Sequence, residues 1–83
     1  MFFVDKFAQE LIRLAKSSDQ TERMEAAYLI GELADVPQDL LNVLYELIQD
    51  EFLEVQTTAN EALKKILIKQ YGWKLDLNDS QSQ

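Results

Sequence analysis

The sequence predicts an all-α protein built from two helical hairpins, four helices in all, that stack as a short right-handed α-solenoid. The first observation is an internal repeat, because a shift of 33 residues places the segment 22–33 on the segment 55–66. The second is that each repeat contains two stretches whose apolar residues recur at the helical period. A repeat of about thirty residues that holds two helices is typical of solenoids. We expect repeat one at about 3–34 and repeat two at about 37–70.

A first helix is predicted over residues 3–16. Its apolar residues form a wide stripe at helical spacing, which comprises Phe3, Val4, Phe7, Ala8, Leu11, Ile12, Leu14 and Ala15. A stripe of this width can cover a neighbouring helix and also close the end of the core. We expect Phe2 and Phe3 to plug that end.

A break at 17–20 separates the first helix from a second one that runs to about Ala34. Asp19, followed three residues later by Glu22, resembles a capping box at the start of this helix. The inward face is predicted to consist of Ala26, Ala27, Leu29, Ile30 and Leu33. Gly31 costs about 1 kcal/mol relative to alanine inside a helix, so we expect its backbone to pack closely against a neighbour.

The third and fourth helices are predicted over about 37–49 and 52–70. Pro37 suits a first helical turn, where its missing N–H group would have no partner in any case. The third helix carries Leu40, Leu41, Val43, Leu44, Leu47 and Ile48 on its apolar face. The fourth carries Val55, Ala59, Ala62, Leu63, Ile66 and Leu67 on its inner face.

The chain changes character beyond the fourth helix. Gly72 fits the position that follows a helix end, and residues 73–77 alternate apolar and charged side chains in an extended pattern. This segment either folds back over the exposed flank of the last helix or presents Trp73 to a partner. We expect a single domain over residues 1–77 and a disordered polar tail over 78–83.

The 83 residues are enough for one domain and include neither cysteine nor histidine. Their net charge is −7, and residues 17–63 hold eleven acidic residues against Arg23 alone. Such a surface repels phosphate backbones, so it disfavours nucleic acid and favours a basic protein partner. A plain role in solubility is the alternative. No signal peptide or membrane-spanning run is visible, so we expect a cytoplasmic protein without membrane contact.

Motifs for catalysis, nucleotide binding or metal binding are absent from the sequence. The carboxylates gather on the second helix and around 50–54, where they fit solvated faces and helix starts better than acid–base chemistry. A weak calcium site at Asp50 would lack the loop spacing and the turn glycine of a dedicated site. We therefore expect no catalytic residue, no cofactor and no metal.

The second helix of each repeat approaches the pattern Val-Arg-x-x-Ala-x-x-Ala-Leu-x-x-Ile. Residues 55–66 match it almost completely, whereas residues 22–33 match less well because Glu22 replaces the valine. The pattern resembles HEAT repeats, in particular the short HEAT-like units of phycobilisome lyase-type proteins. Arg23 keeps the arginine of that family but Gln56 replaces it in the second unit, so we expect no ordinary Asp–Arg ladder between the units.

The resemblance implies that the second helix of each hairpin lines an inner, often concave, surface. On a helical wheel, the solvent-facing residues are Thr21, Glu25, Tyr28 and Glu32 on one helix and Glu54, Thr58, Glu61 and Lys65 on the other. The predicted partner-binding residues are Glu25, Tyr28, Glu32, Glu54, Thr58, Glu61 and Lys65. Tyr28 is the central candidate, because exposed aromatics often anchor interfaces. Alternatively, it lies along the hairpin groove with its hydroxyl in water.

The predicted function is a non-catalytic protein-interaction module that binds a basic partner through the second and fourth helices. One alternative is an inhibitor or immunity-type protein whose carboxylates block a basic site on a toxin or nuclease. Another, implied by the resemblance, is a HEAT-like protein associated with a pigment carrier or a lyase. Two repeats are few for a free solenoid, so self-association as a homo-oligomer is a further alternative.

Overall fold

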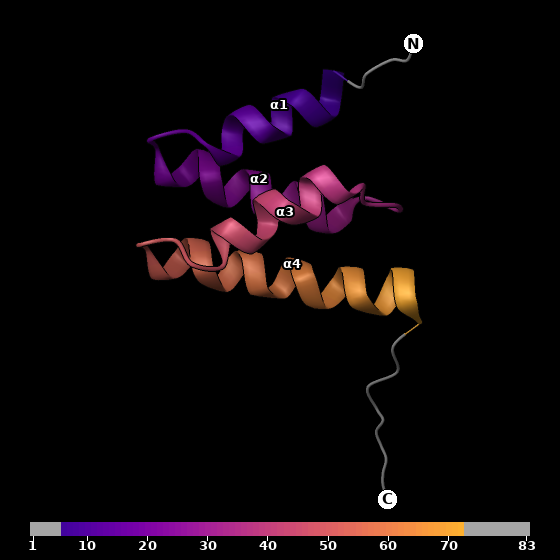
Figure 1. Ribbon diagram of the computed structural model, residues 1–83. Coiled ribbons are helices and arrows are strands. Elements are labelled where there is room, and N and C mark those ends of the chain that lie inside the picture. The colour runs from indigo at the N-terminus through magenta and orange to yellow at the C-terminus, as the bar shows by residue number, and fades with distance from the viewer. Residues whose placement is uncertain (1–5, 73–83) are drawn as a thin grey trace, which may run out of the picture.

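A computed structural model describes residues 6–72 of the protein. It contains four helices, namely α1 (Lys6–Ala15), α2 (Gln20–Glu32), α3 (Gln38–Leu47) and α4 (Leu53–Tyr71), and no strand among the described residues. The chain reverses direction at every loop, so α1 with α2 and α3 with α4 form antiparallel hairpins, and α2 runs parallel to α4 (Figure 1). The predicted all-α fold with helical hairpins is confirmed.

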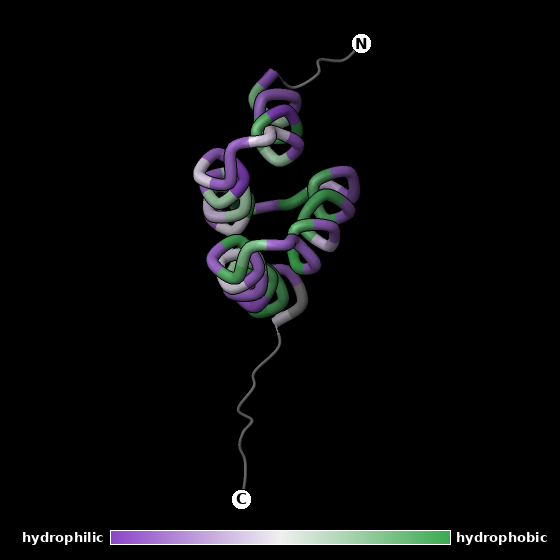
Figure 2. The backbone as a smooth tube through the Cα atoms, turned by 90° about the vertical axis from the view of Figure 1, so that its left-hand side faces the viewer, coloured by the Kyte–Doolittle hydropathy of each residue, from purple (hydrophilic) through white to green (hydrophobic). Residues whose placement is uncertain are grey.

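The core lies where the four helices meet. Each helix contributes at least one large side chain that is fully buried, and these are Leu11, Ile30, Leu40, Leu44, Val55 and Ile66. Figure 2 shows α2 and α4 one above the other, with α3 beside them. Apart from Leu67, which is not among the residues of the core, the inward faces predicted for α2, α3 and α4 lie in or against this core, because each helix turns its apolar stripe toward the others.

The two hairpins approach each other closely at Gly31 of α2 and Ala62 of α4. A Cβ atom on Gly31 would lie 2.7 Å from the Cβ atom of Ala62 and 2.8 Å from its Cα atom. Both separations are shorter than van der Waals contact, so only glycine fits without a shift of the neighbouring helix. Three more buried alanines lie on the same two helices, and these are Ala26, Ala27 and Ala59. The predicted close packing at Gly31 is confirmed.

The ends of α2 and α4 follow local capping chemistry. Asp19 precedes α2, and its carboxylate accepts a 2.9 Å hydrogen bond from the Thr21 amide. The predicted reciprocal capping box is wrong, because the Asp19 amide donates to the Ser17 hydroxyl at 3.0 Å and not to Glu22. Gly72 follows α4 with a φ of 60°, a left-handed conformation that suits the helix-end position predicted for it.

Three predicted details differ from the structure. α2 ends at Glu32 and not near Ala34, because Leu33 has an extended backbone. α3 is shorter than predicted, and Pro37 precedes its first residue instead of lying in its first turn. Phe7, expected in the buried stripe, is 52% exposed, because the beginning of α1 diverges from α2 (Figure 1).

The predictions for Phe2, Phe3 and the segment 73–83 lie outside the described residues. No helix within residues 6–72 is long and apolar enough to cross a membrane.

Candidate functional site

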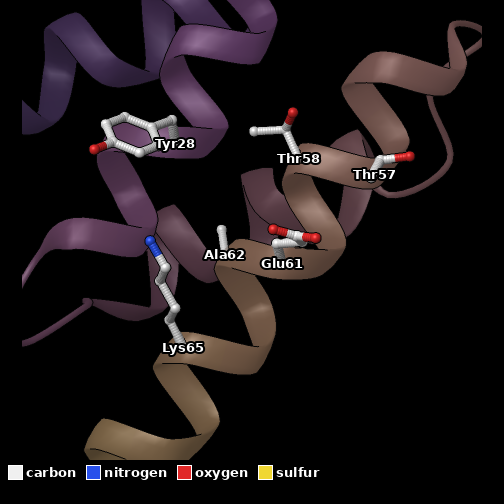
Figure 3. Close-up of a pocket in the computed structure, with 6 residues that line it drawn as sticks. All are labelled: Tyr28, Thr57, Thr58, Glu61, Ala62 and Lys65. Carbon is white, nitrogen blue, oxygen red and sulfur yellow. The ribbon is translucent and has the colours of Figure 1, made fainter.

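A groove follows the line where α2 and α4 meet on their solvent-facing side, and we call it the α2/α4 groove. Its central depression has a volume of about 250 Å³ and is lined by Tyr28, Thr57, Thr58, Glu61, Ala62 and Lys65 (Figure 3). Two further depressions continue it, one lined by Met24, Leu53, Glu54, Thr57 and Thr58 and the other by Glu32, Lys65, Ile68 and Lys69. Because neighbouring depressions share lining residues, the three form one continuous surface.

The sequence repeat explains why the two predicted solvent stripes meet in this groove. α2 and α4 run parallel, and residues 33 positions apart, such as Glu32 and Lys65, become direct neighbours. Ala62 forms part of the floor, where its contact with Gly31 brings the two backbones together. Larger side chains on either side of this floor form the walls of the groove.

Six of the seven predicted partner-binding residues line the groove, and these are Tyr28, Glu32, Glu54, Thr58, Glu61 and Lys65. The seventh, Glu25, is exposed on α2 one turn before Tyr28. The structure therefore brings the six predicted residues together on one surface.

Tyr28 stands at the centre of the groove and is 54% exposed. The ammonium group of Lys65 lies 5.3 Å from the centroid of its ring, which is within the range of a cation–π contact. In Figure 3 the Lys65 side chain extends from α4 toward the ring of Tyr28. About half of the Tyr28 surface stays open to a partner beside this contact.

Lys65 also forms an ion pair with Glu32, with 2.5 Å between its Nζ atom and the Oε2 atom of Glu32. The hydrogen bond within this pair raises the pKa of Lys65 and lowers the pKa of Glu32. Both side chains are about half exposed, so water screens the pair and its contribution to stability is small. Its main consequence is that the negative charge of Glu32 is neutralised at this end of the groove.

The groove is acidic at its opposite end and in its middle. Glu54, beside Leu53 at that end, and Glu61, in the central depression, are exposed and form no ion pair within residues 6–72. Exposed carboxylates raise the local concentration of cationic groups and steer a basic partner toward this part of the surface. The acidic character predicted for the whole ridge is thus concentrated between Leu53 and Glu61.

Apolar side chains mark both ends of the groove, and the sequence reading missed them. Leu53, beside Met24, is 70% exposed, and Ile68, beside Lys69, is 50% exposed. Both lie off the buried stripe of α4 in the helical wheel. Their position off this stripe was the signal that could have identified them as exposed apolar contacts.

Arg23 joins the two hairpins through a bidentate ion pair with Asp50. Its Nε atom lies 2.7 Å from Oδ1 and its Nη2 atom 3.1 Å from Oδ2 of Asp50, while Nη1 donates to the Ser17 carbonyl at 2.8 Å. This single pair links the units, whereas an ordinary Asp–Arg ladder would also need an arginine at position 56, where the chain has Gln56. The partner of Arg23 lies in the loop before α4, so the replacement at Gln56 does not affect it.

Lys69 fixes the other end of the α2–α4 contact. Its ammonium group donates hydrogen bonds of 2.8 Å to the Gly31 and Leu33 carbonyls, which lie at the end of α2. A cation at this position also interacts favourably with the negative end of the helix dipole. With the Arg23–Asp50 pair near the start of α2 and Lys69 at its end, the two walls of the groove are held at both ends.

The groove offers a shape and a charge pattern for binding. Its carboxylates are exposed to water, and acid–base work by paired carboxylates needs burial that moves their pKa values apart. The described part of the chain contains no group of three or more acidic side chains placed to hold a metal ion. No family model, curated protein or solved structure matches the chain, so its function has to be argued from its own residues.

Proposed function

We propose that the protein is a non-catalytic, HEAT-like interaction module whose α2/α4 groove binds a basic segment of a partner protein. The observation that supports this best is the half-exposed ring of Tyr28 at the centre of a groove that Glu54 and Glu61 line. Tyrosine is enriched at interface anchors because a rigid ring buries a large area at low entropic cost.

The construction of the groove supports the same proposal. Close packing of Gly31 against Ala62 holds the two walls of the groove in place in the absence of a partner. The Arg23–Asp50 ion pair near the start of α2 and the hydrogen bonds of Lys69 at its end have the same effect. A preformed surface loses little conformational entropy on binding, so more of the contact energy appears as affinity. The exposed carboxylates add electrostatic steering, which raises the association rate and selects basic partners.

The test is affinity capture of proteins from the native source, followed by elution with rising salt. Wild-type protein is compared with Glu54→Lys in the groove and with Asp39→Lys outside it. Each substitution replaces an exposed carboxylate in the first turn of a helix, α4 or α3, so their effects on folding are matched. We expect the wild type and Asp39→Lys to retain basic proteins that Glu54→Lys does not retain. Equal retention by all three proteins would contradict the proposal.

A further inference from the structure

We infer that the occupant of the α2/α4 groove is an amphipathic α-helix of about four turns, with its basic residues confined to the half that lies against Leu53 and Glu54. This inference rests on the proposed function and adds the shape, length and charge pattern of the segment that the groove accepts. It is carried by three observations, which concern the spacing of the apolar contacts, the state of the backbone along the groove, and the distribution of charge.

The apolar contacts are spaced along the groove at intervals that suit a helix. Leu53 and Ile68 lie 15 residues apart on α4, which corresponds to roughly 22 Å along the helix axis. Tyr28 contributes a third contact near the middle, where it lines the same depression as Ala62. A docked helix meets three such contacts with apolar residues about seven positions apart, which is about two turns.

The backbone along the groove favours a helix over an extended peptide. α2 and α4 use their backbone N–H and C=O groups within the helices, so the groove offers no open sheet edge to a strand. The side chains of Thr57, Glu61 and Lys65 would offer an extended peptide only scattered hydrogen-bond partners, so most of its backbone groups would lose water without gaining a partner. A helix satisfies these groups internally and presents only its side chains.

The charge along the groove is asymmetric. Beside Leu53, the carboxylate of Glu54 has no ion-pair partner within residues 6–72. Around Ile68, Glu32 is paired with Lys65, and Lys69 adds a further positive charge. Lysine or arginine side chains of the occupant are therefore favoured at the Leu53 end and repelled at the Ile68 end. The pattern sets where the basic half lies, whichever way the occupant chain runs.

The experiment uses a synthetic peptide of about 18 residues, long enough to cover the groove. It carries leucines about seven residues apart on one helical face, lysines in one half only, and a nitroxide spin label at the lysine-rich end. A control peptide has the same composition and label but leucines distributed around the helix. Binding to the ¹⁵N-labelled full chain is followed by NMR, with the affinity taken from the titration.

We expect the amphipathic peptide to bind about tenfold more tightly than the control peptide, which corresponds to about 1.4 kcal/mol. Its label should broaden amide signals near Leu53 and Glu54 and leave those near Ile68 sharp. Equal affinity of both peptides for this surface would overturn the helical occupant while leaving the proposed function in place. Broadening at both ends alike, or no perturbation of α2 and α4, would also overturn the inference.

Variants of the two apolar ends give an independent readout. Leu53→Ser and Ile68→Ser change exposed side chains, so the fold should persist, and each should weaken peptide binding by about three- to tenfold. Tyr45→Ser is the matched control, because Tyr45 is also exposed but belongs to α3, which does not line the groove. Equal weakening by all three substitutions would overturn the inference.

Discussion

The guanidinium group of Arg23 and the carboxylate of Asp50 form two parallel hydrogen bonds, of 2.7 and 3.1 Å, that join the first hairpin to the loop before α4. Both side chains are nearly buried. Arg23 also lies 5.8 Å from the centroid of the Phe52 ring and donates to the Ser17 carbonyl. This one side chain therefore links the loop between α1 and α2 to the loop between α3 and α4. Its loss should lower the stability of the whole fold.

Replacement of Asp50 by asparagine should destabilise the protein by about 1.5–3 kcal/mol, the usual range for a hydrogen bond to a charged group. The asparagine keeps the size of the side chain but leaves the buried guanidinium without its counter-charge. Urea unfolding followed by circular dichroism measures the difference. Asp39→Asn, at an exposed position on α3, is the control and should change stability by less than about 0.5 kcal/mol. Similar losses for both variants would contradict a specific role for the pair.

The stability of the wild-type protein should fall in acid through the same pair. The hydrogen bond from Arg23 lowers the pKa of Asp50 below its ordinary value of 3.8. A carboxylate whose pKa is lowered by folding stabilises the folded state above its unfolded pKa and loses this contribution as the pH falls through its folded pKa. The stability gap between wild type and Asp50→Asn should therefore be complete near about pH 7 and shrink below about pH 4. A gap that stays constant down to about pH 2 would show that the ion pair is not its cause.

Replacement of Gly31 by alanine should destabilise the protein by about 1–2 kcal/mol, although alanine is the better helix former by about 1 kcal/mol. The new Cβ atom would lie 2.8 Å from the Cα atom of Ala62, so the α4 backbone would have to move. The double variant Gly31→Ala/Ala62→Gly removes one of the colliding methyl groups. Its loss in the free energy of unfolding should be smaller than the sum of the losses of the two single variants by about 1 kcal/mol. Strict additivity in urea unfolding would show that the two residues are not coupled.

Replacement of Tyr28 by alanine should weaken partner binding by about tenfold or more, while the helical circular dichroism spectrum stays unchanged. Tyr45→Ala provides the control, because the two tyrosines are exposed to nearly the same extent but only Tyr28 lines the groove. The measurement is titration of the captured partner against each variant. If Tyr28→Ala binds as tightly as Tyr45→Ala, the binding surface lies elsewhere on the molecule.

The helical period and the repeat were sufficient to predict most of the fold. Spacing alone placed Leu11, Ile30, Leu44 and Ile66 in the core and the carboxylates Glu54 and Glu61 in water. In the structure Glu32 lies opposite Lys65, 33 residues away, because equivalent positions on parallel neighbouring helices lie side by side. These features depend only on regular helix geometry, which local sequence determines well.

Contacts that involve loops or chain ends were not predictable in the same way. The Arg23–Asp50 pair depends on the path of the loop before α4, which no periodic pattern specifies. Exposure of Phe7 depends on how far α1 diverges from α2, a property of the assembled helices and not of its own stripe. Leu53 and Ile68 lie beside the polar stripe of α4, so the helical period that identifies this stripe does not identify them as part of the same surface.

The Arg23–Asp50 ion pair between the hairpins has a consequence for any lengthened version of this protein. At the positions 33 residues away, Ser17 corresponds to Asp50, and Gln56 corresponds to Arg23. In a tandem fusion of two copies, Gln56 of the first copy would therefore face Ser17 of the second copy. This amide and hydroxyl would stand where the existing contact between hairpins has a guanidinium and a carboxylate. Gln56→Arg in the leading copy and Ser17→Asp in the trailing copy would supply the missing ion pair. A designed fibre of many copies would need both substitutions at every junction between copies.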